Sequence, residues 1–192
     1  MIRIGILGDI GSGKSYIAKK FGYPVFNADE EVGRLYRRDK KIFKNLKKVI
    51  PKYIHSFPIK KKEITTAILA NKKNLKKIII IIHHAIKKKM IVFLKKNVNK
   101  KIVILDIPLL LENKINNKKD ILVFVQSRKV EIIKKLKKRE NFNLKLWKKF
   151  KSIQLPLDYK KKKSDFIIKN NFTHKLIKKS INSILKKILR DE

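Results

Sequence analysis

Eight residues near the start of the chain have the types and spacing needed to hold a row of phosphate groups. Gly8 to Ser15 read GDIGSGKS, which satisfies the pattern G-x-x-x-x-G-K-[ST] of a phosphate-binding loop. Glycines let such a loop turn with positive φ and point backbone N–H groups at a β-phosphate, at the positive end of the following helix. Lys14 would reach the β and γ oxygens, and the Ser15 hydroxyl would contact Mg²⁺. The residues expected to bind ATP here are Gly8, Gly11, Ser12, Gly13, Lys14, Ser15 and Tyr16.

The residues around the loop support this interpretation. Four of the six glycines of the chain fall between residues 5 and 13, a clustering that background composition does not explain. An apolar run over Ile2–Leu7 predicts a strand before the loop, and the apolar spacing over Lys14–Phe21 predicts a helix after it. The alternative is a glycine turn that precedes a helix by chance in a lysine-rich chain.

Apolar runs and helical spacings alternate along the rest of the chain. A short strand is expected over Tyr23–Asp29, then a helix over Glu30–Ile50 that Pro51 would end. A long helical pattern over Ile64–Leu94 is expected to break near Asn71, because an asparagine can cap a new helix. The remaining strands are expected at Ile102–Leu105, Asp120–Gln126 and Asp165–Asn170, and the remaining helices at Arg128–Lys138, around Trp147 and Phe150, and after a cap at Thr173. Strands separated by helices imply a parallel sheet covered on both faces.

Two carboxylates stand where strands are expected to end, at the edge where open α/β sheets bind ligands. Asp29 could accept a proton from an attacking hydroxyl or hold a metal ion indirectly. The alternative role of Asp29 is to cap a helix that begins at Glu30. Asp106 closes the run IVILD, as expected for an acid near Mg²⁺, and its alternative role is that of an ordinary turn residue.

Several segments together resemble the dephospho-CoA kinase family. These are GDIGSGKS, then VFNAD ending at Asp29, then ILDIPLLLEN over Ile104–Asn113, and the last is the more specific. A series of Gln154, Lys160, Asp165 and Asn170 also matches the order of residue types near the end of the family's sequences. The resemblance therefore extends from Ile2 to about Asn170.

This resemblance implies a P-loop kinase that transfers the γ-phosphate of ATP to the 3′-hydroxyl of dephospho-CoA, with Mg²⁺. It implies that Asp29 is the catalytic base and that Lys14 is a second catalytic residue. It also implies that Arg139 is a lid arginine that stabilises the transferring phosphoryl group. It places Asn170 near the ATP adenine and His83 on the acceptor side, although His83 fits a partly buried helix position almost as well. The acceptor-binding set it implies is Asp29, His83, Pro108, Leu109 and Glu112.

Some positions depart from the family pattern. Leu7 and Asp9 replace a threonine and a glycine around the first loop glycine, but phosphate binding requires neither. His84 replaces a proline, so the helix is expected to continue where the family breaks it. Lysines stand where arginines are expected, at Lys135 and at Lys61 or Lys62, and they supply charge without a bidentate fork.

The formal net charge of +37 by itself suggests nucleic acid, an anionic membrane or phosphorylated small molecules as partners. The excess is mostly lysine spread along the whole chain, which favours a compositional bias over a selected nucleic-acid surface. Trp147 and Phe150 among lysines could form a stacking stripe, but we expect them to make core contacts. With no cysteine, no signal-like N-terminus and no apolar run long enough to span a bilayer, we expect a cytoplasmic protein without a membrane or specific nucleic-acid partner.

The expected fold is α/β, a P-loop NTPase-like three-layer sandwich with about five parallel strands, helices on both faces and a helical lid. We expect one domain over residues 1–192, with an acceptor-binding helical region near 55–97 and a lid near 139–164, acting as a monomer on ATP and dephospho-CoA. A nucleoside or nucleoside-monophosphate kinase on the same fold remains an alternative, as does a basic nucleic-acid-binding protein.

Overall fold

The computed structural model of the protein describes residues 1–140 and 142–190, and they form two compact units. The first, called the sheet unit, consists of Met1–Asn27, Asn97–Phe142 and Gln154–Glu192. The second, called the helical unit, consists of Ala28–Lys96 and Asn143–Ile153. Each unit draws on segments far apart in the sequence, so each depends on long-range packing.

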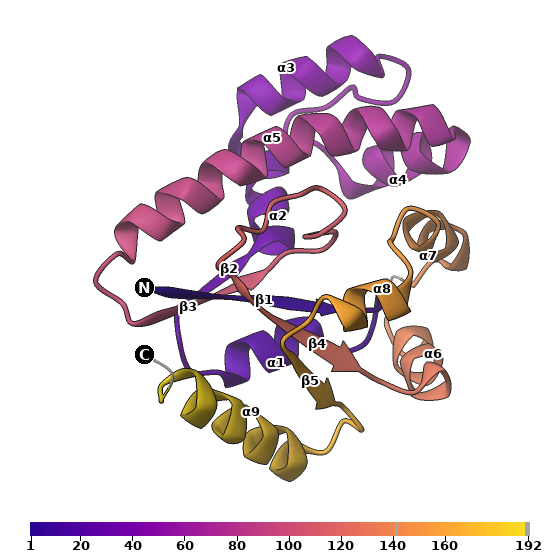
Figure 1. The fold of residues 1–192 in the computed structure, drawn as a ribbon. Helices are drawn as coiled ribbons and strands as arrows, with labels where there is room; N and C mark the ends of the chain where they lie inside the picture. Colours follow the sequence, from indigo (N-terminus) through magenta and orange to yellow (C-terminus); the bar gives the residue numbers. More distant parts are fainter. Residues whose placement is uncertain (141, 191–192) are drawn as a thin grey trace. The chain divides into compact units, whose positions relative to one another are not determined.

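The described residues of the sheet unit form a five-stranded sheet in the order β2-β3-β1-β4-β5, with every pair parallel (Figure 1). The central strand β1 pairs with β3 on one side, where Ile4 faces Ile104, and with β4 on the other, where Ile4 faces Ile121. The strands are β1 (Ile2–Gly8), β2 (Val25–Asn27), β3 (Ile102–Asp106), β4 (Ile121–Gln126) and β5 (Phe166–Lys169). The next two strands along the chain, β2 and β3, lie on one side of β1, and the last two, β4 and β5, lie on the other side. The carboxyl end of β1 is therefore at a topological switch point.

Two helices pack on one face of this sheet, α1 (Lys14–Lys20) and α9 (His174–Ile188), on the lower side in Figure 1. Alternate β1 residues such as Ile4 and Ile6 enter this core, where they meet Ile17 of α1 and an isoleucine stripe of α9. On the other face, Leu110 and Leu122 come so close to Gly5 that a Cβ there would lie 2.7 Å from Leu110 Cδ2. The sheet unit also contains α6 (Lys129–Lys137) and α8 (Leu157–Lys162).

The helical unit contains α2 (Ala28–Arg38), α3 (Lys40–Val49), α4 (Lys61–Ala70), α5 (Lys72–Lys96) and α7 (Leu144–Lys151). The long helix α5 packs against α2, α3 and α4, and α7 packs against α4. A lysine of α7 connects this helix to α4, because Lys149 Nζ donates to the carbonyls of Ile68 and Leu69, each at 2.9 Å. These carbonyls belong to the last turn of α4, where a cation is favourable to the helix dipole.

The parallel sheet and the α/β class are confirmed, and most element predictions hold within a few residues. The break at Asn71 is confirmed, since its side chain accepts from Lys73 N at 2.8 Å and begins α5. Thr173 is the N-cap residue of α9, but its side chain makes no capping hydrogen bond.

Two helices differ from the predictions. The single helix over Glu30–Ile50 is two helices, because Asp39 accepts hydrogen bonds from the N–H groups of Lys41 and Ile42 and starts α3 as its N-cap. No separate helix was predicted for α8 within the expected helical lid, since half of its six residues are lysines and its apolar periodicity is too short to identify. Among the helices of the described residues, none combines the length and the apolar character that a membrane crossing requires.

Candidate active site

The loop from Gly8 to Ser15 connects the central strand β1 to α1 and has a backbone that only glycine adopts easily. Gly8, Gly11 and Gly13 have φ angles of 143°, 89° and 91°. A Cβ at Gly8 would lie 2.7 Å from the carbonyl oxygen of Val125, and one at Gly11 would lie 2.9 Å from Leu136 Cγ. Conformation and close packing together therefore require glycine at these loop positions.

Lys14 is folded over this loop. Its Nζ donates to the carbonyl oxygen of Asp9 at 2.7 Å and to that of Gly8 at 3.3 Å. The next two residues, Ser15 and Tyr16, lie on the first turn of α1 with exposed side chains. A lysine ammonium held at the mouth of a glycine loop, with a hydroxyl one residue further on, is the arrangement that phosphate binding requires.

Asn170 and Ser127 contact the loop from the ends of two other strands. Asn170 follows β5, and its Nδ2 donates to the carbonyl oxygen of Ser12 at 2.7 Å. Ser127 follows β4, and its Oγ donates to the same oxygen at 3.0 Å. Asn170 was among the predicted ATP residues, whereas Ser127 was missed, although a polar residue just after a strand could have indicated it.

Asp106 is the last residue of β3, as predicted, and only 3% of it is exposed. Its Oδ2 accepts a hydrogen bond from Asn27 Nδ2 at 3.0 Å. Asn27 ends β2 and is opposite Asp106 in the register of the two strands. Sequence reasoning missed Asn27, although it lies beside Asp29 in the segment VFNAD. This pair places an oriented carboxylate at the carboxyl edge of the sheet, the same edge as the phosphate loop.

The segment DIPLLLEN forms a tight turn after β3. Leu109 has a φ of 60°, Pro108 is exposed, and Leu110 is buried against the sheet. Glu112 is almost buried, and its Oε1 lies 2.5 Å from Lys160 Nζ and accepts from Leu155 N at 3.0 Å. The buried Oε2 atom has no hydrogen-bond partner among the described residues. Glu112 therefore makes internal contacts, which neither support nor contradict its predicted contact with the acceptor.

Asp29 belongs to the helical unit, and its predicted local structure is wrong. It is neither the end of a strand nor an N-cap, because β2 ends at Asn27 and α2 begins at Ala28. The pairing of β2 with β3 covers only Val25 to Asn27, so the chain becomes helical earlier than the sequence suggests. Asp29, Glu30 and Glu31 thus share the first turn of α2, where the helix dipole favours negative charge.

His83 lies half-buried on α5, with its Nε2 atom buried and unpartnered among the described residues. Burial lowers the pKa of His83 below its ordinary value, and the charges of Lys87 and His84 act in the same direction. The helix continues through His84 without a break, as the missing proline predicted.

Arg139 lies exposed just beyond α6, in the sheet unit. The expected lid over residues 139–164 is divided, since Asn143–Ile153 belong to the helical unit and the segment from Gln154 to the sheet unit. Trp147 and Phe150 are half-buried on α7, and the indole Nε1 of Trp147 is buried. This burial supports core contacts rather than a stacking stripe for nucleic acid.

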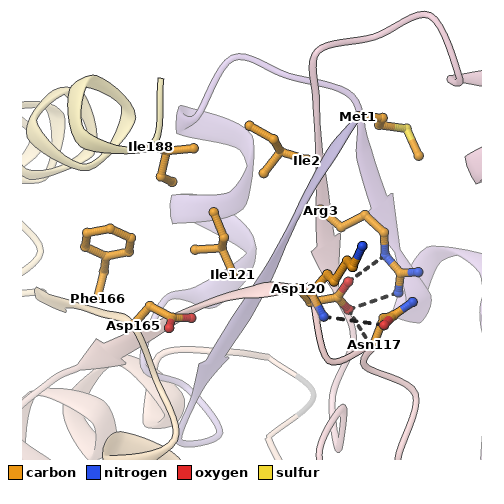
Figure 2. Close-up of a pocket in the computed structure, with 10 residues that line it drawn as sticks. Met1, Ile2, Arg3, Asn117, Asp120, Ile121, Asp165, Phe166 and Ile188 are labelled. Carbon is orange, nitrogen blue, oxygen red and sulfur yellow. Dashed lines mark hydrogen bonds and ion pairs between the residues drawn. The ribbon is translucent and has the colours of Figure 1, made fainter. Parts of the chain in front are cut away.

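A hollow of about 570 Å³ lies at the opposite, amino-terminal edge of the sheet and contains none of the predicted ATP residues (Figure 2). Arg3 fills one side of it with a two-point pair to Asp120, with Nε–Oδ1 and Nη2–Oδ2 both at 2.9 Å. Burial raises the pKa of Asp120, while the Asn117 N–H and Arg3 oppose the rise. This ion pair joins β1 to the residue that precedes β4, so we assign the two side chains a structural role.

The parallel sheet and the glycine loop after its central strand define a P-loop kinase fold. Two solved structures share it across nearly the whole chain. A Thermus thermophilus protein has a TM-score of 0.77 and 24% identity, covering 99% of this chain and 97% of that chain. A dephospho-CoA kinase from Campylobacter jejuni has a TM-score of 0.61 and 20% identity, with 97% and 96% covered.

The sequence comparisons define the family more narrowly. The family model for dephospho-CoA kinase matches residues 2–176. A dephospho-CoA kinase from Wolbachia sp. subsp. Brugia malayi is 32% identical over 187 residues, which cover 95% of each chain. This chain belongs to the dephospho-CoA kinase family, and the predicted resemblance is confirmed. Its function is the ATP-dependent phosphorylation of dephospho-CoA in coenzyme A biosynthesis, so the predicted phosphotransferase activity and its two small-molecule substrates are confirmed as well.

Proposed function

We propose that the loop Gly8–Ser15 of this chain holds ATP and that the γ-phosphoryl group passes to the 3′-hydroxyl of dephospho-CoA, giving coenzyme A and ADP. The observation that carries the proposal is the loop itself, with three positive-φ glycines and Lys14 Nζ 2.7 Å from the carbonyl of Asp9. Carbonyl oxygens are weaker partners for an ammonium than phosphate oxygens are. Lys14 would therefore exchange these carbonyls for β and γ oxygens when ATP enters, while loop N–H groups hold the β-phosphate.

Mg²⁺ fits the residues present, because Ser15 and Asp106 offer the oxygen ligands that this hard cation prefers. The carboxylate of Asp106 is nearly buried, and the hydrogen bond from Asn27 Nδ2 at 3.0 Å gives it a defined direction. Ser15 would contact the ion directly, and Asp106 would hold it directly or through water. When bound, Mg²⁺ would neutralise charge on the phosphate oxygens.

The roles proposed for the acceptor side follow the family resemblance residue by residue. Asp29 would orient the 3′-hydroxyl and accept its proton, and Arg139 would stabilise charge on the transferring phosphoryl group. His83, with a lowered pKa, is suited to act as a neutral hydrogen-bonding group. The remaining acceptor contacts in the proposal are Pro108, Leu109 and Glu112, with Tyr16 and Asn170 on the ATP side. Closure of a lid near residues 139–164 would exclude water as a competing acceptor.

The test is ADP release with Mg-ATP and dephospho-CoA, compared for the unaltered chain, Asp29→Asn and Glu30→Gln. Glu30 is a matched control, because it is acidic, exposed and in the same first turn of α2, so both variants lose the same helix-dipole interaction. If Asp29 takes the proton, Asp29→Asn lowers kcat by about 10²- to 10⁴-fold, while Glu30→Gln stays close to the parent. Equal and small effects of the two variants would reject Asp29 as the base.

Two alternative functions are tested beside this one, the first in the same assay and the second by a binding measurement. Turnover on a nucleoside monophosphate with none on dephospho-CoA would indicate a nucleoside-monophosphate kinase. A basic nucleic-acid-binding protein would retain salt-sensitive nucleic-acid binding in Lys14→Ala, whereas we expect Lys14→Ala to abolish turnover with the fold intact. A cytoplasmic monomer remains our proposal for the state in which the enzyme works, and light scattering would test the monomer.

A further inference from the structure

We propose that Ser127 and Asn170 are positioning residues that hold the phosphate loop in its ATP-binding shape through one atom, the carbonyl oxygen of Ser12. The inference rests on the proposed use of the loop for ATP. It assigns Ser127 a part in the reaction, and it gives Asn170 a role different from the contact with adenine that the family resemblance implies.

Both side chains donate to the same acceptor. Asn170 Nδ2 lies 2.7 Å from the Ser12 oxygen, and Ser127 Oγ lies 3.0 Å from it. A carbonyl oxygen has two lone pairs, so the two donors fill its capacity. Ser12 is completely buried and Asn170 is 3% exposed, and a lost donor would therefore not be replaced easily by water.

Fixing this oxygen also fixes an N–H group of the loop. The peptide between Ser12 and Gly13 is planar and trans, so its C=O and N–H bonds point in opposite directions. With the Ser12 oxygen directed at β4 and β5, the Gly13 N–H is directed away from them. A loop N–H that is already oriented for phosphate binds without a further ordering cost.

Asn170 is itself held rigidly. Its Oδ1 accepts from Phe172 N at 2.8 Å, and its own backbone N–H donates to the carbonyl of Gln126 at 2.8 Å. Gln126 is the last residue of β4 and precedes Ser127, so the two donors are joined by the pairing of β4 with β5. The two donors thus form one rigid support at the carboxyl edge of the sheet.

The same contact explains the last glycine of the loop. A Cβ at Gly13 would lie 2.5 Å from Asn170 Nδ2, well inside van der Waals contact. Asn170 occupies the space that a side chain at this position would need. The donor amide and the glycine therefore depend on each other.

The test measures the affinity of Mg-ATP and of inorganic tripolyphosphate by titration calorimetry. Tripolyphosphate has no nucleobase, so its affinity depends on the loop and not on a contact with adenine. Asn170→Asp keeps an acceptor for Phe172 N but replaces the donor to Ser12 with a carboxylate oxygen. Asn171→Asp controls for the added charge, because Asn171 is exposed, is the next residue, and accepts from Thr173 N in the same kind of turn at 3.1 Å.

Ser127→Ala removes the second donor without a charge change, and Ser127→Thr keeps the hydroxyl. Ser180→Ala is its control, because Ser180 Oγ also donates to a backbone carbonyl at 3.0 Å, on α9. From the usual free-energy contribution of one hydrogen bond, we expect Ser127→Ala to weaken the binding of both ligands by about two- to tenfold. We expect Asn170→Asp to weaken it by about tenfold or more. Ser127→Thr and the two controls should bind as the unaltered chain does.

Equal weakening of ATP and tripolyphosphate, larger than that in the controls, would support the proposal. Weakening of ATP alone by Asn170→Asp would indicate an adenine contact and overturn it. Unchanged tripolyphosphate affinity in Ser127→Ala would remove Ser127 from the support even if Asn170→Asp fails to fold. If neither the unaltered chain nor the two control variants bind either ligand, the proposed ATP site itself is rejected.

Discussion

The buried ion pair between Glu112 and Lys160 predicts a large stability loss when Lys160 alone is replaced. The Nζ and Oε1 atoms lie 2.5 Å apart, and the two side chains are 3% and 8% exposed. Replacing Lys160 with methionine keeps most of the volume but leaves the Glu112 carboxylate buried without its cation. The backbone N–H of Leu155 would still donate to that carboxylate, at 3.0 Å.

The cost of breaking a buried pair in this way is about 3–5 kcal/mol, because the desolvated charge loses its compensation. For a chain of this size that corresponds to a Tm lower by roughly 6–20 °C. We would measure it by urea and thermal unfolding followed by far-ultraviolet circular dichroism. Trp147 fluorescence is less suitable as the probe, because this residue belongs to the helical unit while the pair belongs to the sheet unit.

A double-mutant cycle completes the measurement. Glu112→Gln keeps an acceptor for Leu155 N, so Glu112→Gln combined with Lys160→Met should recover more than half of the loss. Lys162→Met is the control, since Lys162 is an exposed lysine on the same helix α8. A loss of less than about 1 kcal/mol for Lys160→Met would refute the reasoning, because that is the scale of a solvated surface pair.

Three further predictions concern single positions. Gly13→Ala should weaken ATP binding at least about tenfold in calorimetry, because the φ angle of Gly13 is 91° and the new Cβ would lie 2.5 Å from Asn170 Nδ2. An unchanged affinity for ATP would contradict this prediction. Asp39→Ala should lower the free energy of unfolding by about 1 kcal/mol in urea titration, because it removes the N-cap of α3, while Asp39→Asn should cost little. His83 has a lowered pKa in the folded state, so as the pH falls through 6.5 this side chain is protonated first in the unfolded chain. The free energy of unfolding therefore decreases until the pH falls below the pKa of His83 in the folded state. His83→Gln should therefore lose less stability than the parent chain between pH 7 and 5, and an unchanged pH profile would show that the burial of His83 has no such effect.

The elements that were predicted well are those with local signals. The strand before the loop, the loop and α1 follow from an apolar run, a glycine pattern and a helical spacing within about twenty residues. The break at Asn71 was also local, since the capping bond reaches only two residues along the chain. The break at Asp39 had the same kind of signal and was missed because the apolar spacing continues across it.

The errors at Asp29 and α8 arise from packing that the sequence does not display. The length of β2 is set by its three paired residues on β3, which lie 79 positions further along the chain. The helix α8 is short and rich in lysine, yet one of those lysines is buried because Glu112 provides its partner. Neither partner strand nor partner acid can be read from the local sequence.

The sequence by itself determined the phosphate loop, the parallel α/β class and the family, because glycine conformations, hydrophobic periods and motif spacing are properties of short segments. The tertiary structure alone decided which side chains support that loop. Ser127 and Asn170 are 115 and 158 positions from Ser12, and they reach its carbonyl oxygen only because β4 and β5 extend the sheet beside β1. Contacts of this kind depend on strand order and register, which are set by the packing of the whole sheet.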